Sequence, residues 1–193
     1  MDAFLIAFST VAIAEMGDRT QLLSLFLSAH FRKPWPIAAA IFVATLANHA
    51  LAGLAGVWLG HYLTAAVLDA AVGVSMLAMA GWTLIPDRLD GDTEIASRGA
   101  FLTTLFAFFV AEIGDKTQIA TVALAAGYSN LPAIVAGTTL GMMAANVPVV
   151  FLGTAFATRL PIKQIHRVAS LLFAGLGLYF IAKAAGHWLH WSF

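Results

Sequence analysis

The sequence is poor in charged residues and contains no cysteine. Only 10% of its 193 residues are charged and 61% are hydrophobic, whereas a soluble domain usually carries about 25% charged residues. Because so few charges cannot coat a globular surface of this length, we expect lipid to be the solvent for much of the chain. The lack of cysteine excludes disulfides, thiolate metal sites and cysteine nucleophiles.

Three further features narrow the possible functions. The net charge is zero with histidine neutral, and there is no basic stripe of the kind that nucleic-acid binding needs. No loop of the type Gly-x-x-x-x-Gly-Lys-Ser/Thr is present, so the chain does not itself hydrolyse ATP. The start, Met1-Asp2, has no basic region and no following cleavage site, so we expect no cleaved signal peptide. We predict that the protein is not an enzyme and has no resident cofactor.

Six long apolar stretches account for most of the chain, and each reaches the roughly 20 residues that a helix needs to cross a bilayer. The sequence therefore predicts an all-α polytopic membrane protein with six transmembrane helices in a single domain. The stretches are Phe4–Ala29, Trp35–Leu59, Tyr62–Ile85, Gly99–Ala126, Leu131–Thr158 and Ile165–Trp188.

The two halves of the chain repeat each other. Residues 15–21 read Glu-Met-Gly-Asp-Arg-Thr-Gln and residues 112–118 read Glu-Ile-Gly-Asp-Lys-Thr-Gln, at an offset of 97. We predict one three-helix repeat in residues 1–86, an acidic cytoplasmic linker in 87–98 and a second three-helix repeat in 99–193. Because three is an odd number of crossings, the second repeat would be inverted relative to the first.

The distribution of lysine and arginine predicts the orientation. With six spans, three short loops share one face of the membrane, and that face should be cytoplasmic because it holds the basic loop residues. Both termini would then be extracytoplasmic. Only Lys183 lies toward the opposite face. The seven basic loop residues are Arg32, Lys33, Arg88, Arg98, Arg159, Lys163 and Arg167.

Four carboxylates lie inside apolar stretches, at Glu15, Asp18, Glu112 and Asp115. On a continuous helix the spacing of three places both acids of a pair on one face. A charge at the bilayer centre costs roughly 2.5–3.5 kcal/mol, so four unpartnered carboxylates would cost on the order of 10 kcal/mol. We therefore predict that these four acids converge near the midplane and bind a metal ion.

Two basic residues offset part of this negative charge. Arg19 and Lys116 each follow the motif glutamate by four residues, so an ion pair within one helix is available. When all four acids are ionised and share a single site, the two motifs together carry a net charge of minus two, which one divalent cation would balance. A buried carboxylate is more easily protonated when no cation is near, so we expect about two protons to be exchanged for each metal ion.

Other polar residues extend the candidate site. Their amide and hydroxyl oxygens suit Ca²⁺, Mg²⁺ or Mn²⁺, although the asparagines could instead form hydrogen bonds between helices. Further possible ligands are Gln21, Gln118, Asn48, Asn146, Thr20 and Thr117.

The remaining notable residues have simpler interpretations. Gly17 and Gly114 permit either local unwinding or close packing, and Gly137-x-x-x-Gly141 is typical of a packing face. We assign His49 to the helix core or an interface, with a proton or metal role as the alternative. Asp69 is assigned a helix-end or surface role.

The duplicated motif Glu-x-Gly-Asp-(Lys/Arg)-Thr, in a chain of this length with six predicted helices, resembles the Gdt-type cation transporters. These are the manganese/calcium transporters of the Golgi and chloroplast and their bacterial relatives. The resemblance implies Mn²⁺ or Ca²⁺ as the transported substrate, exchange for protons, and manganese export by a bacterial form in the inner membrane. Arg19 stands where lysine is common in the family, which keeps the charge.

Two other functions remain open at this point. A passive divalent cation channel would use the same ligands but would show no proton dependence of flux. An intramembrane aspartyl hydrolase would use Asp18 and Asp115 as a pair that shares one proton. Such a hydrolase does not require the neighbouring Glu and Arg/Lys in both halves, so the motif favours a secondary transporter.

Overall fold

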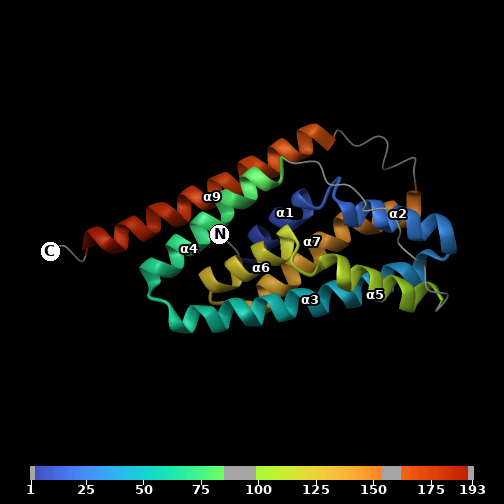
Figure 1. Cartoon of the computed structure of the whole chain (residues 1–193), viewed down its shortest axis with the longest axis horizontal. Helices are drawn as coiled ribbons and strands as arrows, with labels where there is room; N and C mark the ends of the chain where they lie inside the picture. Colours follow the sequence, from blue (N-terminus) through green and yellow to red (C-terminus); the bar gives the residue numbers. More distant parts are fainter. Residues whose placement is uncertain (1–2, 85–98, 154–161, 191–193) are drawn as a thin grey trace.

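The computed structural model describes residues 3–84, 99–153 and 162–190. Within these ranges the chain is all-helical, as predicted, and Figure 1 shows the arrangement of its helices. The predicted linker 87–98 lies outside the described residues. The helices are α1 (Ala3–Ala14), α2 (Arg19–Phe31), α3 (Pro34–Tyr62), α4 (Ala65–Trp82), α5 (Ala100–Glu112), α6 (Lys116–Gly127), α7 (Leu131–Leu152) and α9 (Ile162–His190).

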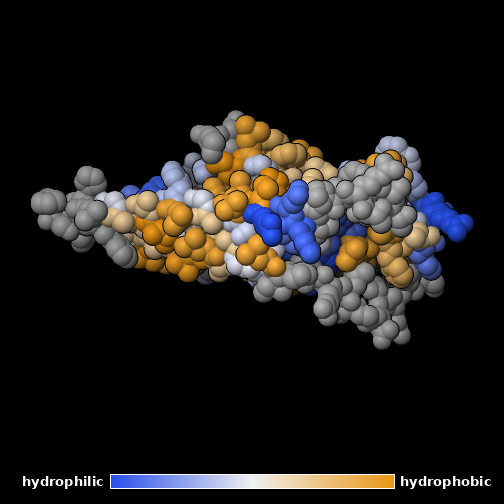
Figure 2. Space-filling model, turned by 90° about the horizontal axis from the view of Figure 1, so that it is seen from above, coloured by the Kyte–Doolittle hydropathy of each residue, from blue (hydrophilic) through white to orange (hydrophobic). Residues whose placement is uncertain are grey.

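Four of these helices are long and apolar enough to cross a membrane on their own. They are α3, α4, α7 and, within α9, residues 166–187. Large apolar side chains are exposed along them, including Leu54, Trp58 and Leu171, and hydrophobic residues cover much of the face seen in Figure 2. This pattern is expected of helices that contact lipid. The chain is a multi-pass membrane protein.

The first and fourth predicted stretches are each divided into two helices. The prediction of one continuous helix was wrong for both, because α1 is separated from α2, and α5 from α6, at the acidic motif. Gly17 (φ 84°) and Gly114 (φ 74°) adopt left-handed backbone conformations at these breaks. Residues with a side chain pay about 1–2 kcal/mol for this conformation, whereas glycine adopts it freely. The local unwinding considered for these glycines is therefore present.

Short polar residues begin the next helices. The Thr64 hydroxyl accepts a hydrogen bond from the Val67 N–H at the start of α4, and the Asn130 side chain accepts one from the Ala133 N–H at the start of α7. Each cap satisfies a backbone donor that has no partner within its own helix. The turns before α4 and α7 are thereby fixed by local sequence.

Glycines allow two pairs of helices to approach closely. A side chain at Gly137 or Gly141 of α7 would lie 2.6 Å from the carbonyl oxygen of Phe4 or Phe8 in α1. The predicted packing face of Gly137-x-x-x-Gly141 is thus confirmed. In the same way, Gly56 of α3 lies against the Val122 carbonyl of α6. Both contacts place long helices directly beside the broken ones.

Two clusters of buried apolar residues hold the helices together. The first cluster joins α4 and α9 to α1 and α6, with Met76, Leu124 and Phe173 among its members. The second joins α2, α3, α5 and α7, and includes Leu27 and Phe108. Within the described residues, α4 and α9 contribute to the first cluster and not to the second. The site lies where the broken helices pass from one cluster to the other.

An ion-pair cluster fastens α4 to α9. Asp69 is buried, with Lys183 Nζ 3.0 Å from its Oδ1 and His187 Nε2 3.2 Å from its Oδ2. Of the two roles predicted for Asp69, the helix-end position fits because Asp69 lies near the start of α4, whereas the surface position was wrong. The physical reason is that α9 packs along α4 and supplies both partners from more than 110 positions away in the sequence.

Candidate metal site

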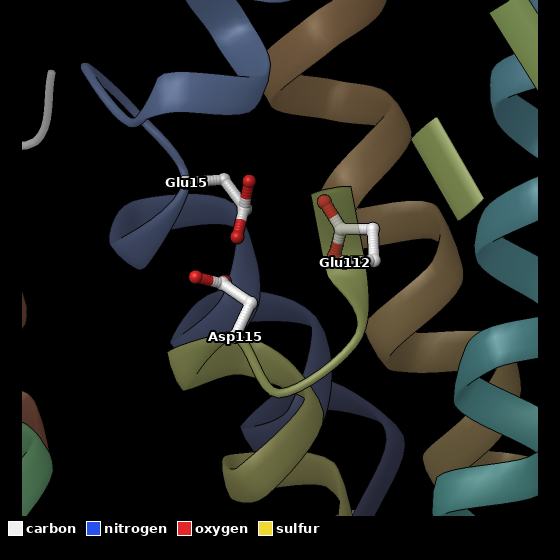
Figure 3. Close-up of side chains that lie close together, drawn as sticks. All are labelled: Glu15, Glu112 and Asp115. Atoms are coloured by element: carbon white, nitrogen blue, oxygen red, sulfur yellow. The ribbon is translucent and has the colours of Figure 1, made fainter. Parts of the chain in front are cut away.

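Three carboxylates from the two halves of the chain meet at the helix breaks. Glu15 follows the end of α1, Glu112 is the last residue of α5, and Asp115 is the N-cap of α6. One oxygen of each lies within 4.8 Å of the others, and Figure 3 shows the three side chains converging. All three residues are buried, at 0%, 0% and 3% exposure. The structure therefore brings together three of the four predicted ligands.

The fourth acid, Asp18, is bound to a lysine. It is the N-cap of α2, and its Oδ1 accepts a hydrogen bond of 2.8 Å from Lys116 Nζ. Both side chains are buried, at 0% and 1% exposure. Asp18 is not a member of the three-carboxylate group. Its negative charge is offset directly by a cation from the opposite half.

Arg19 makes the corresponding contact from the first half to the second. Its Nη2 lies 3.2 Å from Asp115 Oδ1 and donates a 2.7 Å hydrogen bond to the Ala111 carbonyl. The spacing of four made an ion pair within one helix available, but Arg19 contacts Asp115 and Lys116 contacts Asp18, each in the opposite motif. The break removes the helical register that the spacing of four assumes, so each cation reaches across to the other motif.

Threonine hydroxyls bind one side of the carboxylate group. Thr20 Oγ1 donates to Glu15 Oε2 at 2.6 Å, and Thr117 Oγ1 lies 3.2 Å from Asp115 Oδ2 and 3.4 Å from Glu112 Oε2. The other oxygens, Oε1 of Glu15 and Oε1 of Glu112, accept no hydrogen bond from the described residues although both are buried. Buried carboxylate oxygens without a donor need a proton or a cation, so the residues present fit a divalent cation as substrate.

The two glutamines of the motifs stabilise the breaks. Gln21 Oε1 accepts a hydrogen bond from the Gly17 N–H at 2.9 Å, and Gln118 Oε1 accepts one from the Gly114 N–H at 2.7 Å. Each amide oxygen replaces a helix carbonyl that the break has moved away. Gln21 Nε2 also donates to the Ala145 carbonyl of α7 at 3.0 Å. These contacts give the glutamines a role in backbone structure.

The two asparagines form hydrogen bonds between helices. Asn48 Nδ2 of α3 donates to the Phe109 carbonyl of α5 at 3.1 Å. Asn146 Oδ1 of α7 accepts from Ser24 Oγ of α2 at 2.7 Å. These contacts fit the alternative in which the asparagines hold helices together. His49, next to Asn48, is fully buried, and neither ring nitrogen has a hydrogen-bond partner among the described residues.

The contacts of the two aspartates differ from those of an aspartyl hydrolase. Such a site needs two carboxylates that face each other and share a proton. Here Asp18 holds Lys116 and Asp115 holds Arg19. When all four acids are ionised, they and the two cations carry a net charge of minus two, which one divalent cation would balance.

Comparison with known sequences agrees with this chemistry. The profile of the family described as "Divalent cation/proton antiporter GDT1" matches residues 3–91 and 100–188. The chain belongs to the GDT1 family. Each matched segment contains one acidic motif, and the bounds of the second segment lie 97 residues after those of the first. The resemblance inferred from the motifs is confirmed.

Similar proteins occur in bacteria and plants. A Vibrio cholerae protein named "Putative manganese exporter" is 53% identical over 179 residues, which cover 92% of this chain and 90% of that protein. The Synechocystis GDT1-like protein sll0615 is 26% identical, covering 90% of this chain and 93% of its own length. GDT1-like protein 3 of Arabidopsis thaliana is 25% identical, covering 92% and 69%. No solved structure matches the chain.

Proposed function

We propose that the protein is a secondary transporter that exports Mn²⁺ from the cytoplasm in exchange for protons, with Ca²⁺ as a second substrate. The observation that carries this proposal is the group of three buried carboxylates, Glu15, Glu112 and Asp115, at two facing helix breaks. Membership of an antiporter family supports the exchange reaction. The similarity to a protein named as a manganese exporter supports the choice of metal.

The ligand chemistry supports a hard divalent cation. Carboxylate oxygens favour Mn²⁺, Ca²⁺ and Mg²⁺ over soft metals. One divalent cation neutralises the net charge of minus two that remains after Arg19 and Lys116 are counted. When the cation leaves, about two protons restore neutrality, since isolated charges in a low-dielectric region are costly. Metal and protons would thus occupy the same carboxylates in turn.

We further propose that the chain crosses the membrane six times as two inverted repeats, residues 1–86 and 99–193. In this arrangement α1 with α2, and α5 with α6, each form one broken span. The equal offset of the motifs and of the two family matches supports the repeat. In Figure 1, α1 and α2 lead toward one end of the molecule while α5 and α6 lead toward the other, which supports inversion.

The same proposal places the protein in the inner membrane of a bacterial cell. Both of its termini would then lie outside the cytoplasm. Arg32 and Lys33 lie in the turn between α2 and α3, and Lys163 and Arg167 lie in the first two turns of α9. The other basic loop residues, Arg88, Arg98 and Arg159, lie outside the described residues. A C-terminal reporter that is active only in the cytoplasm tests the orientation, and an active fusion would contradict it.

Transport by the purified protein in liposomes tests the function. We expect an imposed pH gradient to drive Mn²⁺ flux, with Ca²⁺ and Mg²⁺ compared under the same gradient. Replacing one ligand, in Glu112→Gln, should abolish the driven flux, because one negative charge and one metal ligand are lost together. The matched control is Asp69→Asn, which removes another buried carboxylate outside the site, and it should retain flux per folded molecule.

Two results would count against the proposal. Mn²⁺ flux that does not depend on the pH gradient would show that the protein is a passive channel. Full activity of Glu112→Gln would show that the three-carboxylate group is not the transport site. Folding of each variant is checked by gel filtration and thermal unfolding in detergent, so that loss of flux is not confused with loss of protein.

A further inference from the structure

The two copies of the motif, although nearly identical in sequence, are in different states in the structure. Lys116 is buried, at 1% exposure, and lies 2.8 Å from Asp18. Its counterpart Arg19 is 36% exposed and lies 3.2 Å from Asp115. Asp18 is therefore held by a buried cation, whereas the cation that contacts Asp115 is partly exposed and Asp115 belongs to the three-carboxylate group.

The hydroxyl contacts show the same difference, whereas the backbone does not. Thr20 donates to Glu15 at 2.6 Å, but Thr117 is shared between Asp115 at 3.2 Å and Glu112 at 3.4 Å. Both breaks nonetheless have a glycine at positive φ whose N–H is bound by the glutamine four residues later. The glycine–glutamine contact is thus the same in both breaks, whereas the side-chain contacts of the motif acids differ.

Helix packing shows the asymmetry on a larger scale. The α4–α9 pair packs against α1 and α6. The offset of 97 relates α1 to α5, α6 to α2, and α4 to α9. If each half adopted the conformation that the other half has here, the same α4–α9 pair would therefore pack against α5 and α2. Within the described residues, the cluster that contains α2 and α5 receives nothing from α4 or α9.

We propose that the third metal ligand alternates between Asp115 and Asp18. In the conformation described here, Glu15, Glu112 and Asp115 form the ligand set while Lys116 holds Asp18. In the second conformation the halves exchange roles, so that Arg19 becomes buried on Asp115 and Asp18 joins Glu15 and Glu112. Both glutamates bind the metal in both conformations. Which aspartate is the third ligand depends on the side of the membrane to which the site is open. This inference rests on the proposed transport function and on the inverted repeat.

The exchange is energetically balanced because both conformations contain the same contacts. Each keeps two aspartate–cation pairs, one buried and one half-exposed, and three carboxylates around the metal. Two states of similar free energy are what a transporter needs to alternate under modest driving forces. The difference between arginine and lysine at the two positions is the main departure from symmetry within the motif.

The absence of cysteine from the chain permits each conformation to be locked with a short bifunctional thiol reagent. Ile6 of α1 and Leu172 of α9 line one cavity of about 270 Å³, so Ile6→Cys with Leu172→Cys should lock the present conformation. At the offset of 97, the positions equivalent to Ile6 and Leu172 in the other repeat are Thr103 of α5 and Ser75 of α4. Thr103→Cys with Ser75→Cys should therefore cross-link only through the second conformation.

Charge-neutral double variants then identify the third ligand in each locked state. Asp18→Asn with Lys116→Met, and Asp115→Asn with Arg19→Met, each remove one negative and one positive charge. In the first lock we expect Mn²⁺ affinity to fall at least about tenfold in the Asp115 variant and to change less than about threefold in the Asp18 variant. In the second lock the order should reverse. Removing both members of a buried pair is often neutral for stability, and thermal unfolding checks this.

The outcomes separate this inference from the proposed function. If both double variants lose Mn²⁺ affinity equally within one locked state, alternation is overturned and all four acids share one site. The proposed transport function would still stand. Failure of the Thr103–Ser75 pair to cross-link, while the Ile6–Leu172 pair does, would also overturn alternation. If Glu112→Gln still binds Mn²⁺ in both locked conformations, the three-carboxylate group is not the transport site, and the proposed function itself is contradicted.

Discussion

Replacing Gly114 by alanine tests whether the helix break is needed for metal binding. Gly114 has φ 74°, and a Cβ built there meets no atom within 4 Å. The cost is therefore conformational rather than steric, about 1–2 kcal/mol for a left-handed residue with a side chain. Alanine also favours a continuous helix over glycine by up to about 1 kcal/mol. Together these terms amount to roughly 2 kcal/mol against the broken form.

Since 1.4 kcal/mol corresponds to a factor of ten, the Mn²⁺ affinity of Gly114→Ala should fall by about 30-fold. Isothermal titration of the detergent-solubilised protein measures this directly. Gly175→Ala is the matched control, because Gly175 lies within α9 and is also surrounded by open space, but its φ is not positive. An unchanged affinity for Gly114→Ala would refute the reasoning that the break positions Glu112 and Asp115 for the metal.

Three further predictions concern protons, packing and the ion-pair cluster. Titrating Mn²⁺ into weakly buffered protein between pH 6 and 8 should release about two protons per ion, and no release across this range would contradict shared occupancy of the carboxylates. Gly56→Ala should destabilise the fold by about 1–3 kcal/mol, because the new Cβ would overlap the Val122 carbonyl. Thermal unfolding measures this, and an unchanged unfolding midpoint would show that α3 and α6 can separate freely. Lys183→Met should lower stability by only about 1 kcal/mol, since the Lys183 side chain is 43% exposed, and the difference from wild type should shrink in high salt; a loss that is independent of salt would indicate packing rather than charge.

Much of the site could be predicted from the sequence because the chain contains the motif twice. Four acids within apolar stretches are costly unless they share a function, and repetition at a constant offset suggested that they meet. The structure brings Glu15, Glu112 and Asp115 together. The placement of Asp18 on Lys116 was not predictable from spacing, because a separation of four residues indicates a pair within one helix only if that helix is continuous.

The breaks and the Asp69 cluster show two other limits of the sequence. Glycine is common in membrane helices and usually serves packing, as at Gly137, so the sequence does not distinguish a packing glycine from one at positive φ. Asp69 has no oppositely charged neighbour near it in the sequence. Its partners lie on α9, and only the packing of α4 against α9 brings Lys183 within 3.0 Å.

Because two helices are broken inside the protein, four helix ends meet at the carboxylate group. The C-terminal ends of α1 and α5 carry partial negative charge, and the N-terminal ends of α2 and α6 carry partial positive charge. The carbonyl ends add to the attraction for a cation, while Asp18 and Asp115 occupy the N-cap positions of α2 and α6. The backbone itself thus provides a fixed electric field in the middle of the molecule. Amide substitutions of all three carboxylates should leave this field in place, but Asp18, Arg19 and Lys116 would then carry a net charge of plus one, so we expect such a variant not to bind a cation.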